Sequence, residues 1–441
     1  MDNKRFIAIG SMLFALFFGA GNLIFPAAMG QASGGNVGWA LLGFCITGVG
    51  LPLLGIVAVG FSGCRDLREV ASRVSPMYGL FYTVVCYMAI GPCFAIPRTG
   101  TVSYEIAVAP FLGPDPSSWA LPIFLVFFLG FSYWLAASPS KLVDRIGKML
   151  TPALLATLLV LIAMSFITPL GEFQEPSKAY ATATVAAVQG VLDGYNTLDA
   201  IAALVFSTLV VNTVREAGVT DPKHISGQVF KAGFIAALLL AVVYIFIAKI
   251  GAESVTAIGL KDTGAPILAE SSQVLFGSFG AMLLAVIVLL ACLTTSVGLL
   301  TCCAVFFMET TGRLKYRQWV ALFTVISYLI GLFGLKTIIV STIPVLMFIY
   351  PLCVALIALI FLHSFFGGRQ CVYVWTMGLT FVMALVNGIE TVGFSLGALG
   401  EALKAYVPLH TLGLGWVPFA IVGFVIGLVW KAVVPQKAAA A

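Results

Sequence analysis

FFGAGNLIFP, residues 17–26, interrupts the first long apolar segment of the chain. Gly19 and Gly21 flank one alanine, Asn22 follows, and Pro26 comes shortly after, so this stretch is a poor continuous helix. In a membrane, a helix can break where the freed backbone groups line a protein interior or a cavity. The stretch therefore predicts a discontinuous helix. The alternative is that the two glycines only allow neighbouring helices to pack closely.

A second interruption has the same character. GVLDGYNTLDA, residues 190–200, combines two glycines, an Asn, a Thr and two Asp next to a strongly apolar run. An acidic side chain inside a membrane span is costly, and it points to function by default. Secondary transporters often contain two inverted repeats whose interrupted helices meet at the midplane. The two interruptions fall in the first and sixth predicted spans, as a five-plus-five repeat requires.

The composition indicates that lipid surrounds most of the chain. Hydrophobic residues make up 61% of the sequence and charged residues only 9%, whereas soluble domains carry about 25% charged residues. Apolar segments of membrane-spanning length recur along the whole chain. We predict twelve transmembrane helices, at 6–31, 37–61, 77–98, 119–138, 148–170, 189–214, 226–250, 274–306, 318–334, 337–362, 371–388 and 415–434.

These spans suggest three parts and one orientation. Residues 1–175 would form the first repeat, 176–368 the second, and 369–441 two appended helices with the C-terminal tail. If both termini are cytoplasmic, the positive-inside rule is satisfied by most of the 23 basic residues. The exceptions are Arg98, Lys178, Lys249, Lys261, Lys336 and Lys404. The sequence thus predicts an all-α, multi-pass membrane protein with cytoplasmic termini.

The eighth predicted span carries three successive hydroxyl side chains, Thr294, Thr295 and Ser296, in its middle. Hydroxyl oxygens are hard ligands and suit a cation such as sodium. Thr294, Gly298 and Thr301 follow one helical face, so two hydroxyls could point at one neighbour. The alternative is that each hydroxyl bonds the carbonyl one turn back.

Polar residues also occur near the outer end of the third predicted span. Arg98 could meet a substrate carboxylate there or form a gate with Glu105, seven residues further on; a structural ion pair is the alternative. Tyr87, nearer the midplane, could donate its hydroxyl to a carboxylate, although ordinary packing is the favoured interpretation.

Four motifs together resemble the bacterial branched-chain amino acid:cation symporter family: FGAGNLIFP (18–26), GPCFAIPRTGTVSYE (91–105), GYNTLDA (194–200) and ACLTTSVGLLT (291–301). The resemblance implies a secondary active importer of leucine, isoleucine and valine, driven by inward sodium flow through alternating access. It places the protein in the bacterial plasma (inner) membrane. It also implies a distant similarity to five-plus-five amino acid transporters with broken helices 1 and 6. One departure is Leu198, where the family favours Met.

By this resemblance, a sodium site lies between the first and eighth spans. The backbone carbonyls of Phe17 and Phe18 and the hydroxyls of Thr294 and Thr295 would hold the ion. Sodium is then the coupling ion, and no other cofactor is expected.

The resemblance also implies a substrate site at the two breaks. The N–H groups of Ala20 and Gly21 would bind the substrate carboxylate, and Asp199 would meet the substrate ammonium or a cation. Asn22 and Thr197 match positions that hold a second, substrate-adjacent cation in some relatives. The expected side-chain pocket is apolar, with walls from Phe94, Ala202 and Phe206.

Other classes of protein fit less well. His224, His363 and His410 lie far apart and near predicted loops, and no nucleophile motif or transition-metal spacing is present, so an enzyme is disfavoured. A channel would need polar residues repeated along a pore, and here they gather at two breaks. The net charge of +5 comes without a basic patch that would bind nucleic acid. Two alternatives stay open: another small amino acid as substrate, or proton coupling through Asp199.

Overall fold

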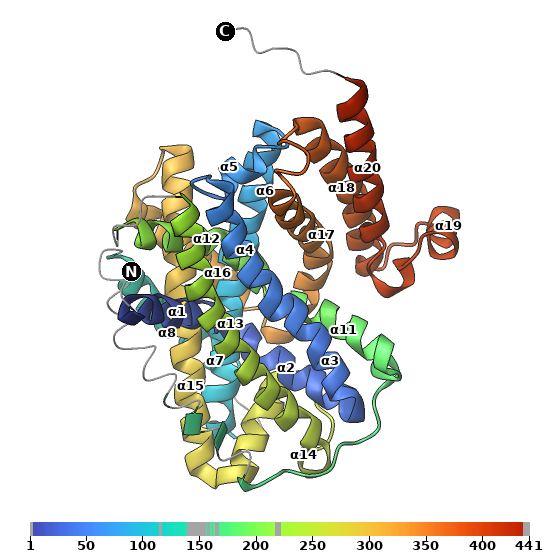
Figure 1. Ribbon diagram of the computed structural model, residues 1–441. Helices are drawn as coiled ribbons and strands as arrows, with labels where there is room; N and C mark the ends of the chain where they lie inside the picture. The colour runs from blue at the N-terminus through green and yellow to red at the C-terminus, as the bar shows by residue number, and fades with distance from the viewer. Residues whose placement is uncertain are drawn as a thin grey trace.

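The structure is a computed structural model that describes residues 3–113, 117–138, 167–216 and 222–434, with 156, 159–160 and 162–163 in between. Every secondary-structure element in these ranges is helical (Figure 1). The all-α prediction is therefore confirmed for the described residues. Most of the predicted fifth span, 148–170, lies outside them.

The helices of the first half begin with two short segments where the sequence predicted one broken span. They are α1 (Asn3–Phe17), α2 (Ala20–Ser33), η1 (Gly34–Asn36), α3 (Val37–Cys45), η2 (Ile46–Gly50), α4 (Leu51–Ser62), α5 (Leu67–Ala71), α6 (Pro76–Met88), η3 (Ala89–Cys93), α7 (Ala95–Ala107), η4 (Ala109–Phe111) and α8 (Ala120–Ala136). The elements η2 and η3 are single π-helical turns.

The second half again begins with a divided span. Its elements are η7 (Lys178–Tyr180), α11 (Ala183–Tyr195), α12 (Asp199–Glu216), α13 (Pro222–Glu253), α14 (Val255–Ile258), α15 (Gly264–Thr311), α16 (Tyr316–Gly331), α17 (Leu335–Phe361), α18 (Gln370–Val392), α19 (Ala398–Tyr406), η8 (His410–Leu412) and α20 (Trp416–Val433). The last two predicted spans correspond to α18 and α20, which pack on each other at one edge of the bundle (Figure 1).

Seven of the described helical segments are long and apolar enough to cross a membrane. They are Ala20–Ser62, Pro76–Phe111, Ile225–Glu253, Gly264–Thr311, Leu335–Phe361, Gln370–Val392 and Trp416–Val433. The bent pair of α11 and α12 adds an eighth if it counts as one span. The chain is thus multi-pass, and the number of twelve spans stays a prediction.

The first break separates α1 from α2 at residues 18–19. Gly19 has an extended backbone, with φ −128° and ψ −159°, and its N–H group donates to Oδ1 of Asn22 at 3.0 Å. Asn22 thus caps the start of the helix to which it belongs. Pro26 lies inside α2, so the break is shorter than the sequence pattern indicated.

The second break separates α11 from α12 at residues 196–198, and the two helices meet at an angle of 44°. Leu198 has φ +68°, a left-handed conformation that costs a residue with a Cβ about 1–2 kcal/mol. Its side chain is buried. The burial of this apolar side chain offsets the cost of the turn.

Gly190 and Gly194 belong to α11 rather than to the second break, contrary to the sequence interpretation. A Cβ at Gly190 would lie 2.0 Å from the carbonyl oxygen of Ala40, and one at Gly194 would lie 2.0 Å from Oγ1 of Thr47. These two glycines therefore allow α11 to pack directly on α3 and the π-turn after it. At these positions glycine serves close helix packing.

Two reciprocal glycine contacts join α2 to α13. A Cβ at Gly30 would lie 2.1 Å from the carbonyl oxygen of Ala248, and a Cβ at Gly251 would lie 2.1 Å from that of Ala27. No side chain fits at such distances. The two backbones are therefore in direct contact, and each glycine fixes the register of the partner helix.

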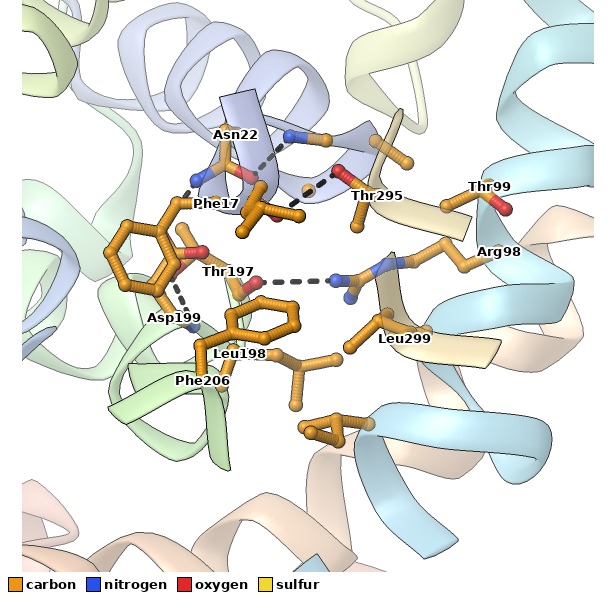
Figure 2. Close-up of a pocket in the computed structure, with 17 residues that line it drawn as sticks. Phe17, Asn22, Arg98, Thr99, Thr197, Leu198, Asp199, Phe206, Thr295 and Leu299 are labelled. Atoms are coloured by element: carbon orange, nitrogen blue, oxygen red, sulfur yellow. Dashed lines mark hydrogen bonds between the residues drawn. The ribbon is translucent and has the colours of Figure 1, made fainter. Parts of the chain in front are cut away.

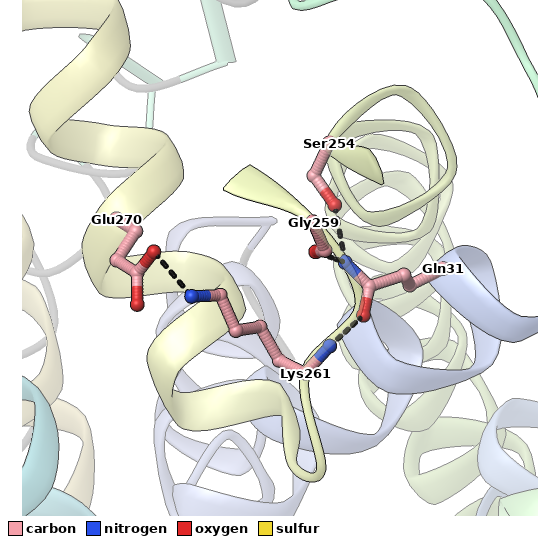
Figure 3. A network of polar contacts seen from close by, with 5 residues as sticks. All are labelled: Gln31, Ser254, Gly259, Lys261 and Glu270. Carbon is pink, nitrogen blue, oxygen red and sulfur yellow. Dashed lines mark hydrogen bonds and ion pairs between the residues drawn. The ribbon is translucent and has the colours of Figure 1, made fainter. Parts of the chain in front are cut away.

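The connection from α13 through α14 to α15 lies against the end of α2 (Figure 3). Nε2 of Gln31 donates to Oγ of Ser254 at 2.8 Å and to the carbonyl of Gly259 at 3.1 Å. The backbone N–H of Lys261 donates to Oε1 of Gln31 at 2.8 Å, and its ammonium pairs with Glu270 at 2.6 Å. One amide side chain thus holds the connection on the bundle.

Candidate functional site

The two breaks meet at a small cavity that α7 and α15 close from the other side (Figure 2). Its volume is about 20 Å³, roughly the room that one water molecule needs. Polar residues of the lining come from both breaks and also from α7 and α15, and apolar side chains line the rest of the cavity. The apolar lining includes Leu16, Phe17, Ile90, Ala95, Ala202, Phe206 and Leu299.

Asp199 is the acidic residue of this cavity, and it is buried. Nδ2 of Asn22 donates to Oδ2 of Asp199 and to the hydroxyl of Tyr244, each at 2.5 Å. The Tyr244 hydroxyl in turn donates to Oδ2 of Asp199 at 2.9 Å. The three residues come from α2, α12 and α13, so one carboxylate connects the two breaks to a third helix.

Tyr244 was missed by the sequence analysis. It lies in the strongly apolar run of the seventh predicted span, where nothing about its spacing sets it apart. The available signal was its hydroxyl, because a tyrosine buried in an apolar segment usually needs a hydrogen-bond partner. Its ring also packs edge-on against Phe44, at 5.1 Å between the centroids.

The two adjacent threonines of α15 face the end of α1. Oγ1 of Thr294 lies 3.0 Å from the carbonyl of Ala15, and Oγ1 of Thr295 lies 3.3 Å from that of Leu16 and 3.4 Å from that of Phe18. These carbonyls are available because the last carbonyls of a helix have no intrahelical partner. The two hydroxyls and three carbonyls are oxygen ligands of the kind that a hard monovalent cation takes.

This arrangement differs in part from the predicted sodium site. The Phe18 carbonyl faces Thr295 as expected, while Phe17 contributes its ring to the cavity lining and Ala15 and Leu16 supply the other carbonyls. The back-bond alternative also occurs, because Oγ1 of Thr294 lies 2.8 Å from the carbonyl of Ala291. The Thr294 hydroxyl thus lies within hydrogen-bond distance of a carbonyl of its own helix and of one at the end of α1.

Ala20 and Gly21 line the cavity as the first residues of α2. Their position fits an anion, because the N–H groups of the first helical turn lack intrahelical partners and the helix dipole is positive there. Thr197 also lines the cavity, but its hydroxyl is engaged within the second break. It donates to the carbonyl of Gly194 at 2.9 Å and accepts a weak bond from the N–H of Asp199 at 3.4 Å.

Arg98 lies in the cavity, not at an outer gate as the sequence suggested. It is 3% exposed, and its guanidinium donates to the carbonyl of Asn196 at 2.8 Å and, more weakly, to that of Thr197 at 3.4 Å (Figure 2). Glu105 lies further along α7, and the structure forms no ion pair between these two described residues. The expected gate pair is therefore absent from this arrangement.

Tyr87 and Phe94 lie outside the lining of this cavity. Tyr87 stacks on Phe306, with 4.1 Å between the ring centroids, and lines a separate cavity of about 160 Å³. The physical reason is the π-turn between α6 and α7, in which Gly91 has ψ −121°. The turn changes the helical register, so a face extrapolated through residues 77–98 is not continuous.

The described residues contain no group of three or more His, Cys, Asp and Glu side chains that could hold a metal ion. Among the polar groups brought together here are a buried carboxylate, two hydroxyls, a helix N-terminus and an arginine. Such a set can bind and orient small charged molecules, and no nucleophile is arranged with a base among these groups.

The profile of a family described as "Branched-chain amino acid transport protein" matches residues 2–434. The chain belongs to this family. The branched-chain amino acid permease BraB of Bacillus subtilis is 46% identical over 97% of this chain and 95% of its own length. The branched-chain amino acid transport system 2 carrier protein of Pseudomonas aeruginosa is 38% identical over 96% and 95%. The family resemblance is confirmed, and so is the prediction that the protein is a transporter and not an enzyme.

Two solved structures show the fold of this family member. MhsT in complex with L-phenylalanine aligns with a TM-score of 0.58 over 96% of this chain and 98% of its own, at 17% identity. Mhp1, a nucleobase-cation-symport-1 family transporter in a closed conformation with bromovinylhydantoin bound, aligns with a TM-score of 0.61 over 96% and 91%, at 14% identity. At these identities the likeness concerns the fold alone.

Proposed function

We propose that this family member imports leucine, isoleucine and valine together with sodium by alternating access. The observation that carries the proposal is that two broken helices place a carboxylate, a helix N-terminus and an apolar wall around one cavity. In this proposal the protein lies in the bacterial plasma membrane with cytoplasmic termini. Its twelve helices form a five-plus-five inverted repeat with two appended helices.

A zwitterionic amino acid fits the charges of this cavity. Asp199 would face the substrate ammonium, and the N–H groups of Ala20 and Gly21 would face its carboxylate. Ala202 and Phe206 would contact a branched aliphatic side chain. Because the cavity is about 20 Å³, the helices around it must move apart to admit leucine, and such a motion is what alternating access requires.

Sodium would bind where the hydroxyls of Thr294 and Thr295 face the carbonyls at the end of α1. An ion there would hold α1 against α15 and stabilise one conformation of the transporter. If that conformation also binds the amino acid better, the two affinities are thermodynamically linked. The inward sodium gradient then drives the amino acid inward together with sodium.

Uptake of labelled isoleucine into proteoliposomes tests this proposal. We expect accumulation that depends on an inward sodium gradient and a rise of about tenfold or more in half-saturating sodium for the double variant Thr294→Ala/Thr295→Ala. The matched control is Thr376→Ala/Thr380→Ala, which removes two buried, back-bonded threonines from α18. The control should retain the native sodium dependence. Native uptake that is equal with and without sodium would refute sodium coupling.

Proton coupling is the second candidate, and the burial of Asp199 at the cavity is the observation that favours it. In that case a pH gradient without sodium would drive uptake, and Asp199→Asn would abolish the response to the gradient. If the native protein takes up another small amino acid but no branched-chain one, the proposed substrate is wrong and the assignment as a transporter still holds.

A further inference from the structure

Arg98 is a fully charged side chain whose hydrogen bonds to described residues go to neutral acceptors. Nη1 donates to the carbonyl of Asn196 at 2.8 Å, and Nη2 reaches that of Thr197 at 3.4 Å, which is a long bond. Nε is buried and has no partner among the described residues. Buried charges are normally paired with an opposite charge and fully hydrogen-bonded, so this guanidinium is under-satisfied.

The guanidinium lies where both broken helices can be reached. On one side are the carbonyls of the second break, at Asn196 and Thr197. On the other side is the start of α2, where a Cβ at Gly21 would lie only 2.7 Å from Nη2. The ring of Phe25 lies 5.2 Å below the guanidinium carbon. Glycine at position 21 is therefore what lets the arginine approach the first helical turn.

Two positive poles converge at this point of the cavity. One is the permanent charge of Arg98, and the other is the N-terminus of α2 at Ala20 and Gly21. The carboxylate of Asp199 lines the same cavity and is held by Asn22. The cavity thus has a positive and a negative end, which is the charge pattern of a zwitterion.

We propose that Arg98 binds the α-carboxylate of the amino acid. Before the substrate binds, the carbonyls of Asn196 and Thr197 accept the hydrogen bonds of the guanidinium. A carboxylate is the better acceptor because it can take two parallel N–H bonds and carries a full charge. When Arg98 turns to it, the two carbonyls lose their donor. The second break is then free to change its angle, so substrate binding is connected to helix motion. This inference rests on the proposed function.

A pair of ligands that differ only at the carboxylate tests the inference. Leucine and leucinamide share the side chain and the ammonium, but leucinamide has a neutral amide. Binding to the purified full chain is measured by calorimetry in sodium at pH 6.5, below the usual α-amino pKa of about 7.7. We expect the native protein to bind leucine at least about 30-fold more tightly than leucinamide. In Arg98→Gln the two affinities should come within about threefold.

Two further variants test the same inference, so that it does not depend on Arg98→Gln alone. Arg98→Lys retains the charge without the planar fork and should give an intermediate ratio. Gly21→Ala should lower the ratio as well, since its Cβ displaces the guanidinium. The matched control is Arg369→Gln, because Arg369 also donates to two backbone carbonyls, at Lys431 and Val434, away from the cavity. This control should keep the native ratio.

A merely structural arginine gives a different result. If Arg98→Gln weakens leucine and leucinamide equally and the ratio stays native, the inference is wrong. If Arg98→Gln does not fold, Arg98→Lys and Gly21→Ala decide, and native ratios in both overturn the inference. A native protein that binds both ligands equally refutes the role of Arg98 and leaves amino acid transport intact. A native protein that binds neither leucine, isoleucine nor valine refutes the proposed function, and the inference fails with it.

Discussion

The two breaks solve one physical problem in opposite ways. Each ends a helix in the protein interior and leaves backbone carbonyls without their usual partners. At the first break these carbonyls face the neutral hydroxyls of Thr294 and Thr295. At the second break the carbonyls of Asn196 and Thr197 face the cation Arg98. The second break thus has a positive charge at its carbonyls, whereas at the first break the proposed sodium ion would supply one.

This comparison bears on the second cation site that the family resemblance implied at Asn22 and Thr197. Nη2 of Arg98 contacts the Thr197 carbonyl, and a second cation placed so close to a buried guanidinium would be strongly repelled. The amide of Asn22 is also committed to Asp199 and Tyr244. We therefore expect sodium at the first break and not at the second.

The largest effect is expected where the two breaks are joined, at Asp199. Asp199→Asn removes the charge that would face the substrate ammonium and places an amide against the donors of Asn22 and Tyr244. Leucine affinity should fall at least about 30-fold, measured by calorimetry on folded protein. Tyr244→Phe keeps the charge and removes one hydroxyl, so it should lower leucine affinity less than Asp199→Asn does. Leucine affinity within threefold of native in Asp199→Asn would separate the carboxylate from substrate binding.

A pair of glycine substitutions separates the two breaks directly. A Cβ at Gly19 would lie 2.7 Å from Oγ1 of Thr295, while one at Gly21 would meet Arg98. Gly19→Ala should raise half-saturating sodium about tenfold, since the displaced hydroxyl belongs to the proposed sodium site. Gly21→Ala should leave half-saturating sodium within about threefold of native.

Sodium-dependent uptake in proteoliposomes, at saturating isoleucine, distinguishes the two glycine variants. If Gly21→Ala changed sodium dependence as much as Gly19→Ala, the assignment of sodium binding to the first break alone would be wrong.

Thr197→Ala should have a smaller effect on transport. The Thr197 hydroxyl is engaged with Gly194 and the N–H of Asp199, so it supports the second break locally. Loss of this cap should cost about 1 kcal/mol of stability and change half-saturating sodium by less than about threefold. Thermal unfolding and sodium titration of uptake measure the two quantities. A large rise in half-saturating sodium would instead support a second cation site at Thr197.

Leu198→Met should have the smallest effect. The substitution conserves volume at a buried position, so it should change stability by less than about 1.5 kcal/mol. Neither sodium dependence nor leucine affinity should shift by more than about twofold. Thermal unfolding and uptake at graded sodium and at graded leucine check these three quantities. A tenfold change in leucine affinity would show that the left-handed turn affects the pocket.

The sequence was informative where chemistry and local propensity coincide. Gly19 and Asn22 indicated a break in the first span, and the structure has one there. Thr294 and Thr295 indicated a hydroxyl pair in the middle of a span, and both face α1. In these cases a residue type is unusual for a helix in lipid, so the deviation itself carries the information.

The sequence was uninformative where the answer depends on register. Ala15 and Leu16 supply carbonyls because α1 ends at Phe17, and helix ends are uncertain by one or two residues from any pattern. Arg98 seemed to lie at an outer mouth because the predicted span ended at residue 98, whereas the helical segment continues to Phe111. Tyr244 was hidden in an apolar run. Backbone geometry and tertiary partners decide these positions.

The interlocked glycines of α2 and α13 make those two helices a single mechanical part. Gly30 and Gly251 each lie on the backbone of the partner helix, so neither helix can slide past the other without a collision. Asn22 lies on α2 and Tyr244 on α13, so these two side chains must move together. Any motion of α12 relative to this pair of helices must therefore break or rearrange the bonds that Asn22 and Tyr244 make to Asp199.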